Sequence, residues 1–301
     1  MLSVLLATAR TVLAAGIAGV LPLALAACGG SHAPSPAATP PSASTPAQGR
    51  HPSMSMPSMS GMPAGNGLAA QQDGYTLASH TTTLPSGTTA TYRFTITAPG
   101  GRPLTDFAVN QTKQLHFYAI RSDLTGFQHV HPTMAAGGTW TARLSALEPG
   151  MWRLFTQFTP ADGPGKGQDL VLSRTVTVPG PASTTALPAP SSSTTVDGYA
   201  LTVRGHLKAG TTSPLTVTVR KSSMPVTDLQ PYLDTYAHLT AFRQGDLAFA
   251  HLHPQNKVTG GHGGPTLDFM ADLPASGNWR LFLQFQTAGT LHTASITLHV
   301  S

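Results

Sequence analysis

An eighteen-residue segment occurs twice in the 301-residue chain, at 115–132 and 237–254, with three histidines at the same spacing in each copy. One histidine near the start is followed by a His-x-His-Pro sequence. The histidines are His116, His129 and His131 in the first copy and His238, His251 and His253 in the second. Imidazole nitrogen suits zinc, copper and nickel ions. Three imidazoles and an open position also match the ligand set of catalytic zinc sites.

Each copy has the pattern of a β-hairpin, and this pattern determines where the histidines would meet. Alternate residues of a strand share a face, so His129 and His131 point the same way. A turn centred on Asp123 and Leu124 places His131 opposite His116, with His129 on the diagonal. Opposed Cβ atoms lie about 5 Å apart and diagonal ones about 7–8 Å, so three imidazoles could converge on one ion. A shift of one residue would move His116 to the wrong face.

Neighbouring side chains could give the two copies different metal preferences. Met134 could add a thioether ligand in the first copy, whereas His262 lies in a glycine-rich segment after the second. Histidines outside the triplets are expected to be ordinary surface or hydrogen-bonded residues, namely His80, His206 and His299.

A purely structural role for the triplets is the alternative. Duplication copies structural histidines as faithfully as metal ligands. The pairs Phe127/Phe249 and Ala119/Ala241 are also retained between the copies, and they have the character of core residues. Retention alone therefore does not separate the two interpretations.

Enzymatic activity is not expected. Zinc-dependent catalysis needs a general acid or base near the ion, and neither hairpin contains a glutamate. Asp123 in the first turn corresponds to Gly245 in the second copy. The chain also has no Gly-x-Ser-x-Gly sequence and no phosphate-binding loop. The missing carboxylates favour holding a metal ion over using it for catalysis.

The histidine hairpins belong to a larger repeated unit. Segments 73–77 and 152–158 of the first unit match 197–201 and 279–285 of the second. Alternating apolar residues, as in 90–96, indicate half-buried strands, and turn sequences separate them. About seven short strands per unit predict an all-β fold, a tandem of two immunoglobulin-like β-sandwiches. A Greek-key or jelly-roll barrel is the alternative.

The expected organisation has five parts. They are a signal peptide (1–27), a disordered tether (28–72), a first β-sandwich domain (73–180), a linker (181–196) and a second β-sandwich domain (197–301). Gly (30 residues) and Pro (26) are abundant and only 10% of residues are charged, as in short strands joined by turns. Basic residues are scattered with no long run, so the net charge of +5 predicts no nucleic-acid partner.

The N-terminus indicates export and a membrane anchor. Arg10 precedes an apolar run of small and aliphatic residues, which is a secretory signal pattern. The run ends in Leu-Ala-Ala-Cys-Gly, with Cys28 as the only cysteine of the chain. This ending resembles the lipobox of bacterial lipoproteins. The resemblance implies that Cys28 is lipidated and that the folded part is extracytoplasmic, anchored to the cell membrane. An uncleaved transmembrane helix is the alternative.

The predicted tether contains four methionines in nine residues, namely Met54, Met56, Met59 and Met62. Thioethers suit Cu(I), and a flexible segment could wrap one ion. In composition this segment resembles the Met-rich segments of extracytoplasmic copper-handling proteins, although their ordered Met/His motifs are absent. The other interpretation is that these methionines arose by chance in a low-complexity tether and have no function.

The leading hypothesis is a membrane-anchored extracytoplasmic protein that binds copper or zinc through a His triplet in each β domain. The alternative is a cell-surface tandem sandwich that binds a protein or glycan, with structural histidines. The chain has a lipobox-like sequence followed by two domains that each contain His-x-His-Pro. In this layout it resembles uncharacterised secreted lipoproteins of actinobacterial type. That resemblance implies no particular activity.

Overall fold

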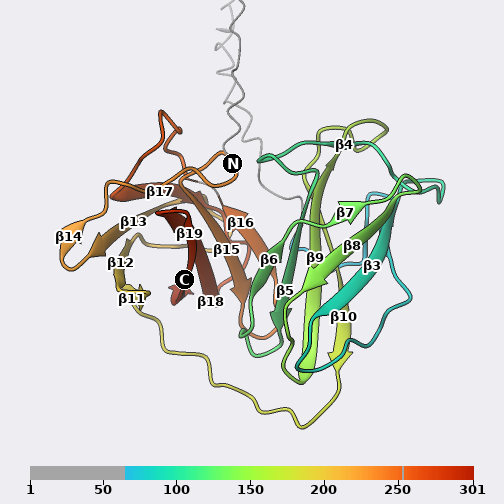
Figure 1. Cartoon of the computed structure of the whole chain (residues 1–301), viewed down its shortest axis with the longest axis horizontal. Helices are drawn as coiled ribbons and strands as arrows, with labels where there is room; N and C mark the ends of the chain where they lie inside the picture. Colours follow the sequence, from blue (N-terminus) through green and yellow to red (C-terminus); the bar gives the residue numbers. More distant parts are fainter. Residues whose placement is uncertain (1–64, 253) are drawn as a thin grey trace, which may run out of the picture. The chain divides into compact units, whose positions relative to one another are not determined.

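The computed structural model describes residues 65–252 and 254–301. Regular structure in these residues consists of nineteen β-strands in four sheets, and every pairing between named strands is antiparallel (Figure 1). No helix in the described part is long and apolar enough to cross a membrane. The predicted lipid attachment at Cys28, the methionine-rich segment 54–62 and the predicted ligand His253 lie outside the described residues.

Domain 1 consists of two sheets. The first has the order β1 (Gln71–Gln72), β2 (Tyr75–Ala78), β3 (Ala90–Thr97), β8 (Thr139–Leu144) and β7 (Thr133–Met134). The second has the order β10 (Leu170–Val178), β9 (Gly150–Pro160), β5 (Leu115–Arg121) and β6 (Gln128–Val130), and β4 (Phe107–Ala108) also pairs with β9. Both histidine-bearing strands, β5 and β6, thus belong to the second sheet.

Domain 2 repeats this plan. One sheet has the order β11 (Ser193–Val196), β12 (Tyr199–Arg204), β13 (Ser213–Lys221) and β14 (Met224–Pro225), with β17 (Thr266–Ala271) also paired to β13. The other has the order β16 (Phe249–Leu252), β15 (Ala237–Arg243), β18 (Gly277–Thr287) and β19 (Thr290–Val300). The histidines His238 and His251 of the second triplet lie on β15 and β16.

Each domain encloses its own apolar core. In β3 the buried side chains alternate with exposed or half-buried ones, and Tyr92, Phe94 and Ile96 face inward. The core of domain 1 also contains Trp152, and that of domain 2 contains Trp279 at the matching position. The prediction of two tandem immunoglobulin-like β-sandwiches is confirmed.

A third apolar cluster joins the two domains, which belong to one compact unit. We call it the interdomain cluster; its buried members are Tyr118, Ile120, Leu124, Phe155, Val171, Phe242, Leu247, Phe249 and Phe282. All seven residues of β5 are buried, because one face of the strand packs into the domain core and the other packs into this cluster. Phe127 stacks on Phe282 with ring centroids 4.4 Å apart. Phe127 is therefore an interdomain contact and not a residue of its own domain's core.

The hairpin of domain 1 has the predicted register. Tyr118 pairs with His129 and Phe117 with Val130, and continuing this register places His116 opposite His131. The turn is stabilised by Asp123, whose carboxylate accepts hydrogen bonds from the Arg121 guanidinium. The β15–β16 hairpin uses the same register, with His251 opposite Thr240.

Replacing Phe155 with alanine tests the interdomain cluster. The ring is fully buried and lies 5.3 Å from Phe249 of domain 2, centroid to centroid. Its removal leaves a cavity, so the free energy of unfolding should fall by about 3–5 kcal/mol in urea titration. The control is Met151→Ala on the same strand, because Met151 is 52% exposed and should change stability by less than about 0.5 kcal/mol. Equal effects of the two substitutions would contradict the described packing.

Candidate metal centre

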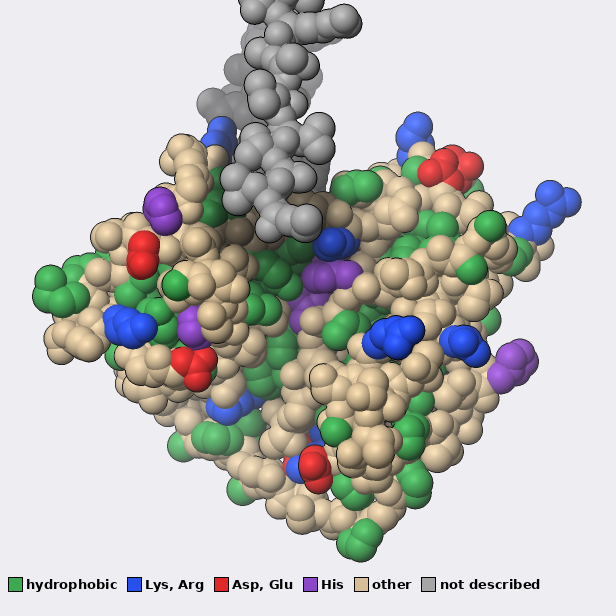
Figure 2. Space-filling view, in the orientation of Figure 1, with side chains coloured by type: hydrophobic (Ala, Val, Ile, Leu, Met, Phe, Trp, Pro, Cys, Tyr) green, Lys and Arg blue, Asp and Glu red, His purple; other side chains and the backbone are tan. Residues whose placement is uncertain are grey.

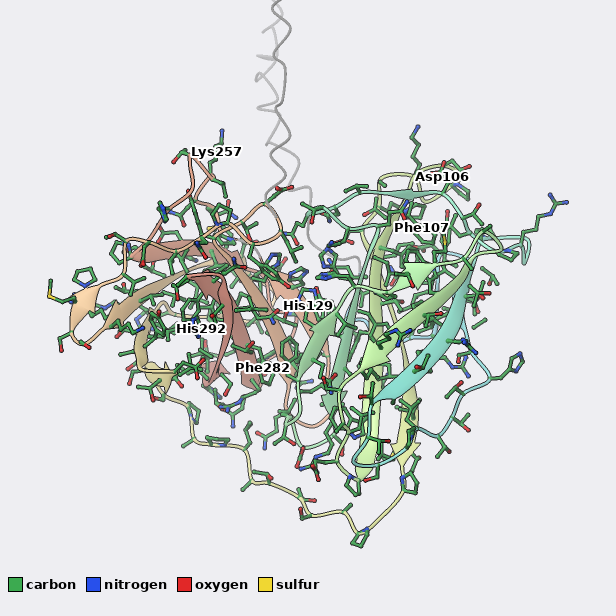
Figure 3. All side chains as sticks on the ribbon, viewed as in Figure 1. Asp106, Phe107, His129, Lys257, Phe282 and His292 are labelled. Atoms are coloured by element: carbon green, nitrogen blue, oxygen red, sulfur yellow. The ribbon has the colours of Figure 1, made fainter. Side chains whose placement is uncertain are left out.

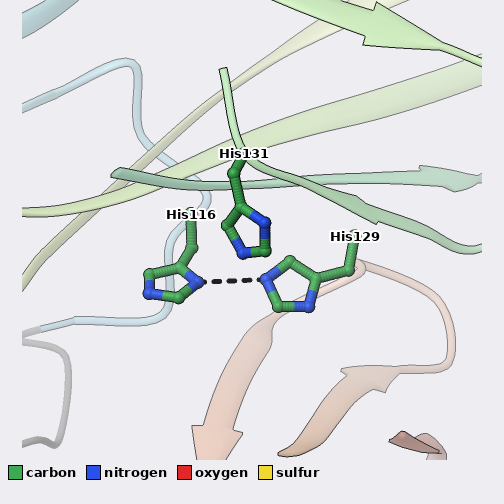
Figure 4. Close-up of side chains that lie close together, drawn as sticks. All are labelled: His116, His129 and His131. Atoms are coloured by element: carbon green, nitrogen blue, oxygen red, sulfur yellow. Dashed lines mark hydrogen bonds between the residues drawn. The ribbon is translucent and has the colours of Figure 1, made fainter. Parts of the chain in front are cut away.

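The hairpin of domain 1 brings its three histidines together. β5 supplies His116, β6 supplies His129, and His131 follows directly after β6. Each ring offers a nitrogen, and these three nitrogens lie within 4.8 Å of one another. Figure 4 shows the three rings facing a common space. The predicted convergence of the first triplet is therefore present in the structure.

Hydrogen bonds to the outer nitrogens of two rings fix their tautomers. His116 Nε2 lies 3.1 Å from the carbonyl oxygen of Asn110, and His129 Nδ1 lies 2.7 Å from Gln284 Oε1. Both oxygens can only accept, so both nitrogens must carry the hydrogen. His116 Nδ1 and His129 Nε2 are then acceptors, and they face each other at 3.0 Å (Figure 4).

Two facing acceptor nitrogens repel each other, and a cation between them would relieve this repulsion. In these tautomers neither nitrogen has a proton to donate to the other. Two nitrogens bound to one tetrahedral zinc ion at about 2.0–2.1 Å would lie roughly 3.3 Å apart, which is close to the 3.0 Å observed between His116 and His129. The outer hydrogen bonds are the contacts that orient histidine ligands in metal sites. The residues therefore fit a metal ion.

Burial keeps these histidines neutral. It lowers the pKa of His116 to about 4 and that of His131 to about 3, and it lowers the pKa of His129 well below its ordinary value. Mutual repulsion of the protonated rings lowers the pKa of His129 and His131 further. Neutral imidazole is the form that binds metal ions. Nε2 of His131 is also buried without a hydrogen-bond partner in the described part of the chain, an unfavourable state that a bound ion would relieve.

Domain 2 repeats the arrangement for the described members of its triplet. His238 Nε2 lies 3.0 Å from the carbonyl oxygen of Tyr232, and His251 Nδ1 lies 2.6 Å from Gln157 Oε1. These bonds again make the inner nitrogens acceptors, and His238 Nδ1 faces His251 Nε2 at 3.4 Å. The structure thus brings His238 and His251 together.

The two sets of histidines lie beside each other. His116 is 5.9 Å from His251, and His129 is 5.9 Å from His238, measured between ring centroids. We call His116, His129, His131, His238 and His251 the interdomain histidine cluster. The sequence predicts one separate site in each domain, whereas the structure places both sets at one interface. Hairpin geometry alone does not contain this information, because it is local to each domain.

Sequence reasoning missed Gln157, Gln284 and Tyr118. Both glutamines occupy the same position of the repeated Trp-Arg-Leu-Phe-x-Gln-Phe segment, on the face opposite the core-facing tryptophan. A repeated polar residue on that face, beside a repeated phenylalanine, is the signal that could have found them. The Tyr118 hydroxyl donates to Gln157 Oε1 at 3.2 Å and also lies 3.0 Å from His251 Nδ1.

The other described histidines take no part in the cluster. Those at positions 80, 206, 262 and 299 are exposed, which confirms the surface prediction for His80, His206 and His299. His292 (labelled in Figure 3) belongs to domain 2 and is buried there. Its Nδ1 lies 2.8 Å from an Asp197 carboxylate oxygen. Met134 packs against the core of domain 1. Figure 2 shows lysine and arginine side chains scattered singly over the visible face, in keeping with the sequence pattern.

Solved structures similar to this chain include three from different organisms. The Escherichia coli adhesin FdeC is 16% identical (TM-score 0.24) over 77% of this chain and 66% of its own. Yersinia pseudotuberculosis InvD is 15% identical (0.25) over 77% and 58%. The Ig1-2 module of the Drosophila receptor protein tyrosine phosphatase DLAR is 8% identical (0.21) over 75% and 98%. The chain spans less than two thirds of the first two structures.

No curated protein matches the sequence significantly. One family model matches it twice, over residues 70–178 and 194–301. The two matches cover both sandwiches, including all the strands that carry the histidine cluster. The chain therefore belongs to the family described as Domain of unknown function (DUF8832), and it carries that domain twice in tandem.

Proposed function

We propose that this protein binds a metal ion through His116, His129 and His131. The observation that carries the proposal is the pair of acceptor nitrogens that face each other at 3.0 Å, with their tautomers fixed from outside. A ring nitrogen of His131 converges on the same space. Three neutral imidazoles at a partly buried site are suited to holding an ion, and the proposed role is binding or handling of the metal and not catalysis.

The proposed ion is copper, with zinc as the other candidate. Nitrogen-only ligands suit Cu(II) and Zn(II), and the four methionines in 54–62 would suit Cu(I). The second triplet, His238, His251 and His253, is proposed as a second binding position. The geometry of His238 and His251 supports it, because their inner nitrogens repeat the arrangement in domain 1.

The proposed location is outside the cytoplasm, with the protein anchored to a membrane by lipid on Cys28. The lipobox-like sequence and the apolar run before it support this proposal. Two or more acyl chains would make a stable anchor, because a single chain binds a membrane only marginally.

A second candidate function is recognition of a protein or glycan by a cell-surface tandem sandwich, with the histidines as structural residues. The burial of the cluster between the domains favours it, since His116 is only 2% exposed and His251 only 1%. Both candidates agree with the fold, and metal binding distinguishes them.

Replacing both His129 and His131 with alanine should remove the first site. Zinc and Cu(II) binding to the wild-type chain should reach about two ions, and the variant should lose the domain 1 ion with at least a 100-fold fall in affinity, because two of three ligands are gone. Isothermal titration measures both quantities. The control is His206→Ala with His299→Ala, which removes two exposed histidines. Wild-type binding no tighter than in a generic histidine-rich protein would refute the proposed function.

Metal binding should persist in mild acid. Protons compete for a histidine nitrogen only as the pH falls towards its pKa, and the pKa values of His116 and His131 are lowered to about 4 and about 3. Zinc affinity at pH 5.5 should therefore be within about threefold of its value at pH 7.5. Three ordinary histidines with pKa near 6.5 would lose roughly 1,000-fold over the same interval. A loss of that size in the wild-type protein would contradict the burial of these ligands.

Replacing Cys28 with serine should release the protein from the membrane. The substitution removes the thiol that the lipid would modify and leaves the remaining signal sequence unchanged. In a bacterial host that processes lipoproteins, the wild-type chain should be recovered with membranes and the variant in the soluble extracytoplasmic fraction. Equal membrane association of both proteins would favour an uncleaved transmembrane segment.

A further inference from the structure

We propose that Gln157 and Gln284 are positioning residues, each holding a histidine of the opposite domain in its metal-binding tautomer. The metal centre would then be complete only when the two domains are docked. This inference rests on the proposed metal-binding function and adds a form of regulation to it: ion binding and domain docking depend on each other.

Gln284 acts from domain 2 on a histidine of domain 1. It lies on β18, is 5% exposed, and its Oε1 accepts from His129 Nδ1 at 2.7 Å. The Gln284 amide nitrogen donates to the Thr293 hydroxyl at 3.4 Å, while its amide oxygen lies towards His129. The nitrogen of His129 that this bond leaves as an acceptor is the one that faces His116.

Gln157 performs the reciprocal task from domain 1. It lies on β9, is 2% exposed, and its Oε1 accepts from His251 Nδ1 at 2.6 Å. Its amide nitrogen donates to Asp169 Oδ2 at 2.6 Å. In this orientation the amide oxygen lies towards His251 and the Tyr118 hydroxyl.

The other histidine of each pair is fixed within its own domain. His116 and His238 donate to the backbone carbonyls of Asn110 and Tyr232, which lie six residues earlier in the chain. Each domain therefore supplies one ligand that is oriented locally and one that needs the partner domain. Without the opposite glutamine, His129 and His251 would each lose a hydrogen-bond acceptor at the outer nitrogen.

Linkage follows from this arrangement. An ion that binds the docked state more tightly than the undocked state must stabilise docking by the same factor. Loss of an outer-sphere partner typically weakens metal binding 10–100-fold. A substitution in domain 2 should thus lower the affinity for an ion whose ligands all lie in domain 1.

The test uses the full chain, with zinc as the probe and Gln284→Leu as the variant. Zinc affinity at the domain 1 site should fall 10–100-fold. Gln284→Glu, which keeps an acceptor for His129 Nδ1, should restore affinity to within about threefold of the wild type. The matched control is Gln286→Leu on the same strand, because Gln286 contacts Gln230. Thermal unfolding of each metal-free variant reports whether it folds.

A second measurement needs no metal. Imidazole ¹⁵N spectra of the metal-free wild type should show His129 protonated at Nδ1, and Gln284→Leu should shift it to a mixture of tautomers. Unchanged zinc affinity in Gln284→Leu, failure of Gln284→Glu to restore it, or an unchanged His129 tautomer would each overturn the inference. A wild-type protein that binds no zinc or copper but shows the expected His129 tautomer shift would instead refute the proposed function.

Discussion

The approach of two acceptor nitrogens, His116 Nδ1 and His129 Nε2, to 3.0 Å is the constraint on which the centre depends. Two lone pairs at this distance repel unless a cation lies between them, and they are held there by hydrogen bonds on the far side of each ring. The acceptor for His116 is a backbone carbonyl of the same domain, and the acceptor for His129 is a glutamine of the other domain. The surrounding packing therefore has to position two domains and not only one hairpin.

The apolar interdomain cluster makes this positioning possible. It covers the outer faces of β5 and β15, which an isolated sandwich would leave to water. The same coverage removes water from the histidines, and this burial is what lowers their pKa values. The interdomain cluster therefore both stabilises the packing of the two domains and keeps the histidines neutral. The rings of Phe155 and Phe249 exclude water from the interface in which the imidazoles stay neutral.

Much of the hairpin could be predicted from sequence, because strand periodicity and one turn determine which side chains are opposite each other. The pairing of Tyr118 with His129 follows from that local geometry. The interface could not be predicted in the same way, since alternation tells inner faces from outer ones but not which outer faces will meet. The sequence of β5 contains a hint, because Tyr118 and Ile120 on its outer face break the alternation expected of a strand with a solvent-exposed face. Gln157 and Gln284 were missed because their partners lie in the opposite domain.

The exchange of contacts between the domains also changes how the duplication is understood. Retention of a histidine in both copies could reflect either framework or ligand when each domain is considered alone. At this interface the two roles coincide: His129 contacts Gln284 while His251 contacts Gln157, so each histidine is both a candidate ligand and a bond between the domains. A change in either copy would therefore disturb the interface that both share. The glutamine contacts thus tie a histidine of each domain to the opposite domain.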